Sequence, residues 1–320
     1  MSAALPLSVF SQQTNLAALV RHAPALNGSG LVEGSVRQLL GENVTLNGGF
    51  TVTGDLLVPG TPTLAVNGHP NFAGAIVGSG STTPTGWQVR LNGNVNLRYL
   101  RTRIDPVALP TVSAPPAPVG TRTVTISSAG QSIGDPATLK HLSLNGNVGQ
   151  VFLPPGTYGN FTASGGSGFT LGVANTTTVY NLQNLTMNGS TRILLLGPVI
   201  LTVANGVTGN GQFGNTNQSS WLQLQIPSGG FTLNGGCTFH GHVTAPAGTV
   251  TINGNSCLIG AVQSDRLTMN GNGCLKAGTV ASVNQPPTAN SQNVTLLEDT
   301  ATGTRSAATI LKTRRSRSLC

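Results

Sequence analysis

The chain has 320 residues, of which 43 are Gly, 8% are charged and 4% are aromatic. This length suits one large domain or two ordinary ones. The low charge and abundant Leu, Val and Ile exclude an intrinsically disordered chain. The excess of Gly, Asn and Thr favours short strands and tight turns over helices.

The net charge of +8 does not indicate nucleic-acid binding. Five of the basic residues lie within the last 16, and without them the charge is +3. The rest of the chain has no basic stripe with interleaved aromatics, so we interpret the five as a solvated tail and expect no nucleic-acid partner. They are Arg305, Lys312, Arg314, Arg315 and Arg317.

Residues 1–25 precede the repeats described below, and we interpret them as an N-terminal cap or the remnant of a leader. Residues 15–20 suit a short capping helix, with Thr14 as N-cap and Pro24 beyond its end. A solenoid needs such a cap to cover its terminal edge. The opening residues lack the basic start and strong apolar stretch of a signal peptide, which counts against secretion unless the start is truncated.

A recurring motif, an apolar residue followed by Asn-Gly, determines the predicted fold. Neighbouring copies lie about 20 residues apart, and degenerate copies such as residues 161–166 fill the longer gaps. We therefore expect about a dozen coils of roughly 20 residues, within the range of solenoid repeats. The nine copies contain Asn27, Asn47, Asn67, Asn92, Asn145, Asn188, Asn234, Asn253 and Asn270.

Each copy has the pattern of a β-coil. In residues 249–252 apolar Val250 and Ile252 alternate with threonines, which places the apolar side chains inward. Asn and Gly tolerate positive φ and so supply the bend, and stacked asparagines can form an amide ladder. Hairpins of an antiparallel sandwich would place turns every 8–12 residues. The sequence therefore predicts an all-β, single-stack, right-handed parallel β-helix over residues 26–283.

Two segments interrupt the repeats. Residues 104–120 contain five prolines and form either a linker between two solenoid blocks or a loop leaving one stack; we favour the loop because the pattern resumes at Thr121. Residues 192–204 are the most apolar run but are too short to cross a bilayer, and Gly197-Pro198 divides them. We expect two buried strands there and no transmembrane segment.

The composition changes from Asn284 onward. Residues 284–300 resemble the first strand of the cadherin-like or immunoglobulin-like tandem modules of large bacterial surface proteins. The residues that remain are too few for such a module, which needs about 100. We interpret residues 284–320 as a linker and a disordered basic tail, with a truncated or frame-shifted end.

The body resembles right-handed parallel β-helix proteins of bacterial surfaces. The resemblance covers residues 26–280 and lies in the Asn-Gly repeats, in Leu153–Gly159 and in Gly241–Gly248. It implies a secreted or surface-anchored protein. The body is also similar to the bactofilins, cytoskeletal β-helices that polymerise end to end, but their cores usually lack Pro-rich insertions.

The acidic residues give no indication of catalysis. Glycosidases and lyases on this fold use clustered carboxylates or an acidic calcium site. No two acids of the body are paired within one coil, and we expect no catalytic, cofactor-binding or metal-binding residues. The acids of the body are Glu33, Glu42, Asp55, Asp105, Asp135 and Asp265.

Three cysteines, Cys237, Cys257 and Cys274, occur once per coil at spacings of 20 and 17 residues, so we expect them to stack in one column. Buried thiols, one disulfide and a metal site remain open alternatives. His240 and His242 share a strand face, and we expect surface histidines there. Trp87, Tyr99 and Tyr158 are scattered, which suits core packing and loop anchoring better than sugar stacking.

The sequence favours a non-enzymatic structural or adhesive module at the cell surface or outside the cell. Its partner would be a surface or matrix component, with polysaccharide as one candidate. A polysaccharide-binding or polysaccharide-cleaving β-helix is the first alternative, and a bactofilin-like polymerising scaffold is the second.

Overall fold

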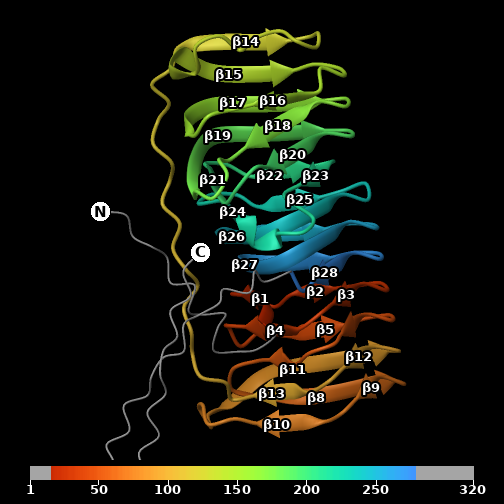
Figure 1. Ribbon diagram of the computed structural model, residues 1–320. Helices are drawn as coiled ribbons and strands as arrows, with labels where there is room; N and C mark the ends of the chain where they lie inside the picture. Colours follow the sequence, from red (N-terminus) through yellow and green to blue (C-terminus); the bar gives the residue numbers. More distant parts are fainter. Residues whose placement is uncertain (1–15, 279–320) are drawn as a thin grey trace, which may run out of the picture. The chain divides into compact units, whose positions relative to one another are not determined.

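The computed structural model describes residues 16–278, which form a parallel β-solenoid of about 11 turns (Figure 1). All strand pairs in this part of the chain are parallel, and one isolated bridge, between Val173 and Thr176, is antiparallel. The prediction of an all-β parallel solenoid is confirmed. Two 3₁₀ turns, η1 (Pro136–Thr138) and η2 (Ser219–Trp221), interrupt the strands.

The strands pair in three ladders, A, B and C; most coils contribute to all three in turn, and the coil of β14 contributes to ladder B alone. Ladder A holds β1 (Leu16–Val20), β4 (Ser35–Gln38), β7 (Leu56–Leu57), β10 (Ala75–Val77), β13 (Leu100–Thr102), β21 (Val199–Val203) and β24 (Leu222–Gln225). Ladder B holds β2 (Ala25–Leu26), β5 (Val44–Leu46), β8 (Thr61–Gly68), β11 (Pro84–Gly93), β14 (Arg122–Ile126), β15 (Leu139–Leu144), β22 (Val207–Gly209) and β25 (Phe231–Leu233).

Ladder C holds β3 (Leu31–Val32), β6 (Thr51–Val52), β9 (Asn71–Phe72), β12 (Asn96–Leu97), β16 (Gln150–Phe152), β18 (Gly168–Leu171), β20 (Arg192–Leu195), β23 (Gln212–Phe213) and β28 (Cys274–Lys276). Four longer strands turn from one ladder into the next: β17 (Gly156–Ser164), β19 (Thr178–Asn188), β26 (Thr238–Ile252) and β27 (Cys257–Met269). Two strands, β20 and β21, form within residues 192–204 as expected, but only β21 is largely buried; β20 alternates, and Leu194 is 41% exposed.

The coils do not stack in chain order. The last described coil pairs with the first, through the registers Ala18↔Val262, Leu26↔Met269 and Leu31↔Cys274. Residues 16–103 therefore lie on one side of this junction and residues 121–278 on the other (Figure 1). Within the first block, β11 pairs with both β5 and β8, so the coil of β11–β13 is inserted between two coils that precede it.

The Pro-rich segment connects the two ends of this stack. It leaves β13 near the β8–β10 end and rejoins at β14, running along the solenoid (Figure 1). The Ile104 N–H donates to the Val58 carbonyl at 3.4 Å, and the Gln183 side chain donates to the Pro116 carbonyl at 3.1 Å. Proline-rich chain extends by about 3.1 Å per residue, so these residues reach about 50 Å, or about ten coils.

The expected N-terminal helix is wrong for Leu16–Val20, which forms β1. All five residues are buried, and the strand pairs with β27 on one side and β4 on the other. A helix here would leave the backbone edges of both neighbours unpaired, at a large cost inside the stack. Residues 1–15 and 279–320 are outside the described residues, and with them the predicted leader, the tandem-module resemblance and the basic tail.

The Asn-Gly motif acts as predicted. The glycine has positive φ in all nine copies, for example +77° at Gly48. A Cβ at Gly48 would lie 2.8 Å from the Gly28 carbonyl oxygen of the next coil, so the close stacking itself requires glycine. The apolar residue before Asn-Gly is buried in eight of the nine copies; Val66, in the coil at the β8–β10 end, is 50% exposed. The interior is one continuous hydrophobic cluster with packed rings of Phe213, Phe231 and Phe239.

We predict that cutting the Pro-rich segment leaves the two blocks associated. A protease recognition sequence inserted between Ser113 and Ala114 would be cleaved in the folded protein, because both residues are exposed. The fragments should co-elute in size-exclusion chromatography, since β1, β2 and β3 pair with β27 and β28. Separation of the fragments without denaturant would contradict the stacking order described here.

Candidate binding face

A single column of small hydroxyl residues runs along the outside of ladder B. The strand registers place one Thr or Ser of each coil directly against that of the next, over eight consecutive coils. None of these residues is buried. The column comprises Thr125, Ser143, Thr162, Thr186, Thr208, Thr232, Thr251 and Thr268.

The outward position of this column follows from the strand period. In β25 and at the end of β26, the residues on either side of each threonine are fully buried, as Phe231 and Leu233 are around Thr232. Successive side chains of a strand point to opposite faces, so burial of the apolar pair directs the threonine to the outside. Beyond the junction the column continues with Ala25 and Thr45 and then meets Arg90.

A column of asparagines lies beside the threonines, two residues further along the strand in six of the eight coils; Ser127 and Ser164 take this position in the other two. Their side-chain amides bond from coil to coil: Asn270 donates to Asn253 at 3.0 Å, and Asn253 donates to Asn234 at 2.8 Å. A second run joins Asn27, Asn47, Asn92 and Asn67 at 2.9–3.2 Å. The expected amide ladder is confirmed in these two runs, where it fixes the asparagine side chains in one orientation.

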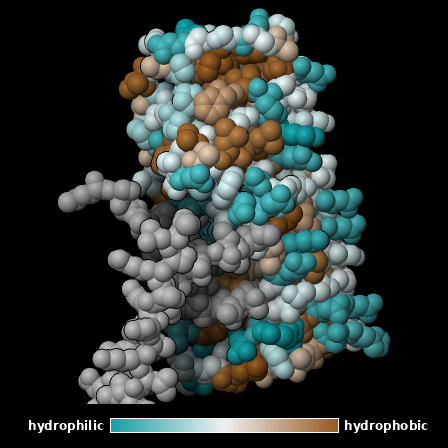
Figure 2. Space-filling view, viewed as in Figure 1, coloured by the Kyte–Doolittle hydropathy of each residue, from teal (hydrophilic) through white to brown (hydrophobic). Residues whose placement is uncertain are grey.

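The two columns together, here called the Thr–Asn face, form a regular grid. Neighbouring coils lie about 4.8 Å apart, and outward residues of one strand lie about 6.6 Å apart. The eight-residue column contains no charged or aromatic side chain. Asn145-Gly146 follows β15, at the edge of the solenoid where β14 and β15 end (Figure 1), and this edge is hydrophilic (Figure 2). The face can therefore match a repeating, uncharged partner.

The acids lie apart from this grid, and two of them meet in space although they are far apart in sequence. His22 Nδ1 lies 2.7 Å from Glu42 Oε1, and its Nε2 lies 3.8 Å from Asp265 Oδ2. Arg21 also pairs with Asp265 at 2.7 Å. These contacts join β27 to the first two coils, so the cluster stabilises the junction between the blocks.

Asp55 is the most buried acid of the described residues. Arg98 Nε donates to one carboxylate oxygen at 2.7 Å, and Arg101 Nε donates to the other. Burial alone would raise the pKa of Asp55, but the hydrogen bonds and charges of the two arginines outweigh it and lower this pKa. The described residues contain no group of three or more His, Cys, Asp or Glu that could hold a metal ion.

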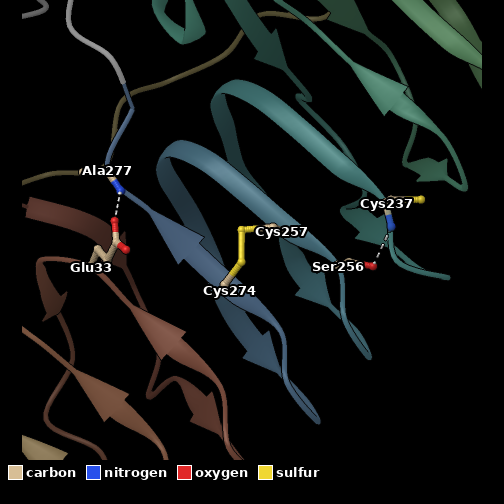
Figure 3. The surroundings of a disulfide bond; sticks show 6 residues. All are labelled: Glu33, Cys237, Ser256, Cys257, Cys274 and Ala277. Carbon is tan, nitrogen blue, oxygen red and sulfur yellow. Dashed lines mark hydrogen bonds between the residues drawn. A yellow bond between two sulfur atoms is a disulfide. The ribbon is translucent and has the colours of Figure 1, made fainter. Parts of the chain in front are cut away.

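The cysteines do not all stack in one column, which corrects the sequence expectation. Cys257 and Cys274 are in register and form a disulfide (Figure 3). Cys237 is one residue out of register, because Thr238 is the residue that pairs with Cys257. It is a free, buried thiol that donates to the Asn234 carbonyl at 2.6 Å, and burial raises its pKa.

The remaining candidate side chains support packing. Trp87 and Tyr158 are buried, and the Tyr158 hydroxyl donates to the Pro154 carbonyl at 2.8 Å, which anchors that loop. His240 and His242 point the same way along β26, but both are half-buried rather than surface residues. Burial lowers the pKa of both imidazoles.

No protein-family model and no curated protein matches the sequence. A solved structure that the chain resembles is an ice-binding protein from an Antarctic Flavobacteriaceae bacterium. The two are 14% identical, and the match covers 83% of this chain and 82% of that chain with a TM-score of 0.26. A likeness of this strength carries no functional argument.

Replacing Asp55 by Asn should lower the free energy of unfolding at neutral pH by about 2 kcal/mol, because two arginines lose a buried carboxylate. The folded-state pKa of Asp55 is depressed, so its contribution is present above its unfolded pKa of about 3.9 and is lost as pH falls through the folded value. Urea unfolding should therefore show the two proteins converging below about pH 4.

Asp135→Asn is the matched control for this experiment. Asp135 is exposed and accepts the Ala137 N–H at the start of η1, a role that Asn performs equally well. Its replacement should leave stability nearly unchanged at both pH values. An equal loss in both variants, or a loss for Asp55→Asn that persists in acid, would contradict the assigned role of Asp55.

In the double variant Cys257→Ser, Cys274→Ser the free energy of unfolding should fall by about 3 kcal/mol. The disulfide closes a 17-residue loop and so lowers the conformational entropy of the unfolded chain, and the variant loses this effect. Reductant should produce the same loss in the wild type and none in the variant. Mass spectrometry after alkylation without reductant should find Cys257 and Cys274 protected. Labelling of both residues would exclude the disulfide.

Proposed function

We propose that this solenoid is a non-enzymatic extracellular module that adheres to a regularly repeating surface through the Thr–Asn face, and that this surface is ice. The observation that carries the proposal is the unbroken register of eight outward Thr or Ser residues, with an amide ladder beside the coils of Thr232, Thr251 and Thr268. A repeating ligand is matched best by a receptor that repeats the same contact on a rigid frame.

The chemistry of the column suits a lattice of water. Each threonine has a hydroxyl that both donates and accepts hydrogen bonds, and a methyl group that is apolar and makes no hydrogen bond with water. Each contact is weak, but a rigid solenoid makes several of them at once without ordering side chains anew. Ala25 follows the eight-residue column across the junction, and Arg90 lies beyond Thr45. A hydrated charge such as that of Arg90 does not fit an uncharged lattice, so the proposed contact is confined to the eight-residue column.

A polysaccharide is the less favoured partner. Sugar-binding sites present aromatic rings or charged groups, and the eight-residue column has neither. Trp87 and Tyr158 are buried in the core, so they are not available to stack on a sugar at this face. An insoluble glycan nevertheless is a regular surface, and the experiment below includes it.

The disulfide supports the extracellular part of the proposal. Cys257 and Cys274 are bonded between adjacent strands at a Cα–Cα distance of 4.5 Å. Such bonds form and persist in oxidising compartments and are rare in the cytosol. Detection of the native protein only in the cytosol, with both thiols reduced, would contradict this assignment.

We predict that the purified protein partitions into slowly growing ice and that Thr208→Tyr with Thr232→Tyr reduces this partition by at least about tenfold, or about 1.4 kcal/mol. The two rings would stand above the grid and keep the face from contacting the lattice. Partition is measured as the concentration ratio between ice and liquid, and thermal hysteresis is measured in parallel.

Thr170→Tyr is the matched control, since Thr170 is a half-exposed outward threonine of ladder C. It should leave both measurements unchanged. The same proteins are tested for sedimentation with crystalline cellulose and chitin. Exclusion of the wild type from ice overturns the proposal, and retention on a glycan with loss in the double variant would assign the face to polysaccharide instead.

A further inference from the structure

A cavity of about 230 Å³ lies at the β8–β10 end of the stack, beside the start of the Pro-rich segment. Its polar wall contains three arginines from two well-separated parts of the chain: Arg37 on β4, and Arg101 and Arg103 on and just after β13. Leu57 and Ile76 supply an apolar wall. The cavity belongs to ladder A and is distinct from the Thr–Asn face.

Arg37 is a buried cation that the described residues satisfy only in part. The side chain is 5% exposed, and one terminal nitrogen donates to the Asp105 backbone carbonyl. Its buried Nε has no hydrogen-bond partner. Burial lowers the pKa of Arg37, and the charge of Asp105 opposes this effect without cancelling it. A buried arginine normally pairs its charge fully, so this one has capacity for a further acceptor.

Arg103 is held in place by its backbone. It has φ of +53°, which is uncommon for a residue other than glycine. Its N–H donates to the Gly60 carbonyl at 3.0 Å, and its Nε donates to the Gly80 carbonyl at 2.9 Å. The terminal nitrogens of its guanidinium make no hydrogen bond within residues 16–278. The Arg103 side chain is therefore fixed in position, and the N–H groups of its terminal nitrogens are available to donate to a ligand.

The local charges are unbalanced in favour of cations. Asp55 is bound by Arg98 and Arg101, so its charge is shared by two arginines. Asp105 is exposed at the rim of the cavity and is the other acid near it. The four arginines of this region therefore exceed its two carboxylates, and the excess lies around Arg37 and Arg103.

We propose that this cavity binds a small ligand through an oxyanion, either a carboxylate or a sulfate, with Arg37 and Arg103 as the donors. Guanidinium groups bind planar or tetrahedral oxyanions through paired N–H donors. The volume admits a molecule about the size of an acidic monosaccharide, whose ring would contact Leu57 and Ile76. The Asp105 carboxylate at the rim would repel the oxyanion and so lower the affinity of the site.

Isothermal titration calorimetry of the full chain at low ionic strength tests this assignment with three probes: sodium glucuronate, sodium sulfate and neutral glucose. Glucuronate should bind with a dissociation constant of about 1 mM or tighter, and glucose should not bind. Sulfate binding as tight as that of glucuronate would identify a site for the bare oxyanion, while weaker sulfate binding would identify one for the acidic sugar. Added salt should weaken either anion.

Three variants separate binding from folding. Arg103→Gln should weaken anion binding by about tenfold through loss of a charged donor, and Asp105→Asn should strengthen it by removing the opposing charge. Arg192→Gln removes an exposed arginine of ladder C and should change nothing. Failure of both anions to bind the wild type, or equal affinities in all three variants, would overturn the proposal. Ice partition is unaffected by either result.

Discussion

The structure depends on one constraint: each strand must pair in parallel and in register with the strands above and below it. In-register stacking places like residues over like residues, so the inward aliphatic and aromatic side chains form one continuous core. The same constraint turns a threonine that occurs once per coil into a column, and an asparagine into a bonded ladder. The core and the candidate binding face are thus two sides of a single pairing rule.

Much of the architecture could be predicted from sequence, because the period is a local property. Asn-Gly at intervals of about 20 residues gave the coil length, and alternation such as that in residues 249–252 gave the inward face. The stacking order could not be predicted, because every coil edge offers similar backbone donors and acceptors. Leu16–Val20 illustrates this: its sequence suits a helix, and only the two unpaired edges of β27 and β4 make it a strand.

The candidate sites divide in the same way. Threonine recurs two residues before the asparagine in many of the repeats, so the Thr–Asn face was present in the sequence as a pattern. The shift of Cys237 was also readable: it follows its asparagine by three residues, whereas Cys257 and Cys274 follow theirs by four. The cavity at Arg37 gave no such signal, because it forms where a distant segment crosses the coil.

The distribution of charge connects the two proposals. The buried and paired ionic groups, Asp55, Arg37 and the cluster around His22, lie on ladder A or at its corners, where they join coils that are distant in sequence. At the junction and along the Pro-rich segment, ionic and hydrogen-bonded charged groups thus hold together coils that are adjacent in space but not consecutive in sequence. In residues 121–278, ladder B stacks coils that are also successive in sequence, so no ionic contacts are needed to join distant coils there. The Thr column on its outer face is uncharged and regular, although exposed Arg266 lies two residues before Thr268 on β27. An uncharged column is the property that contact with a neutral lattice requires.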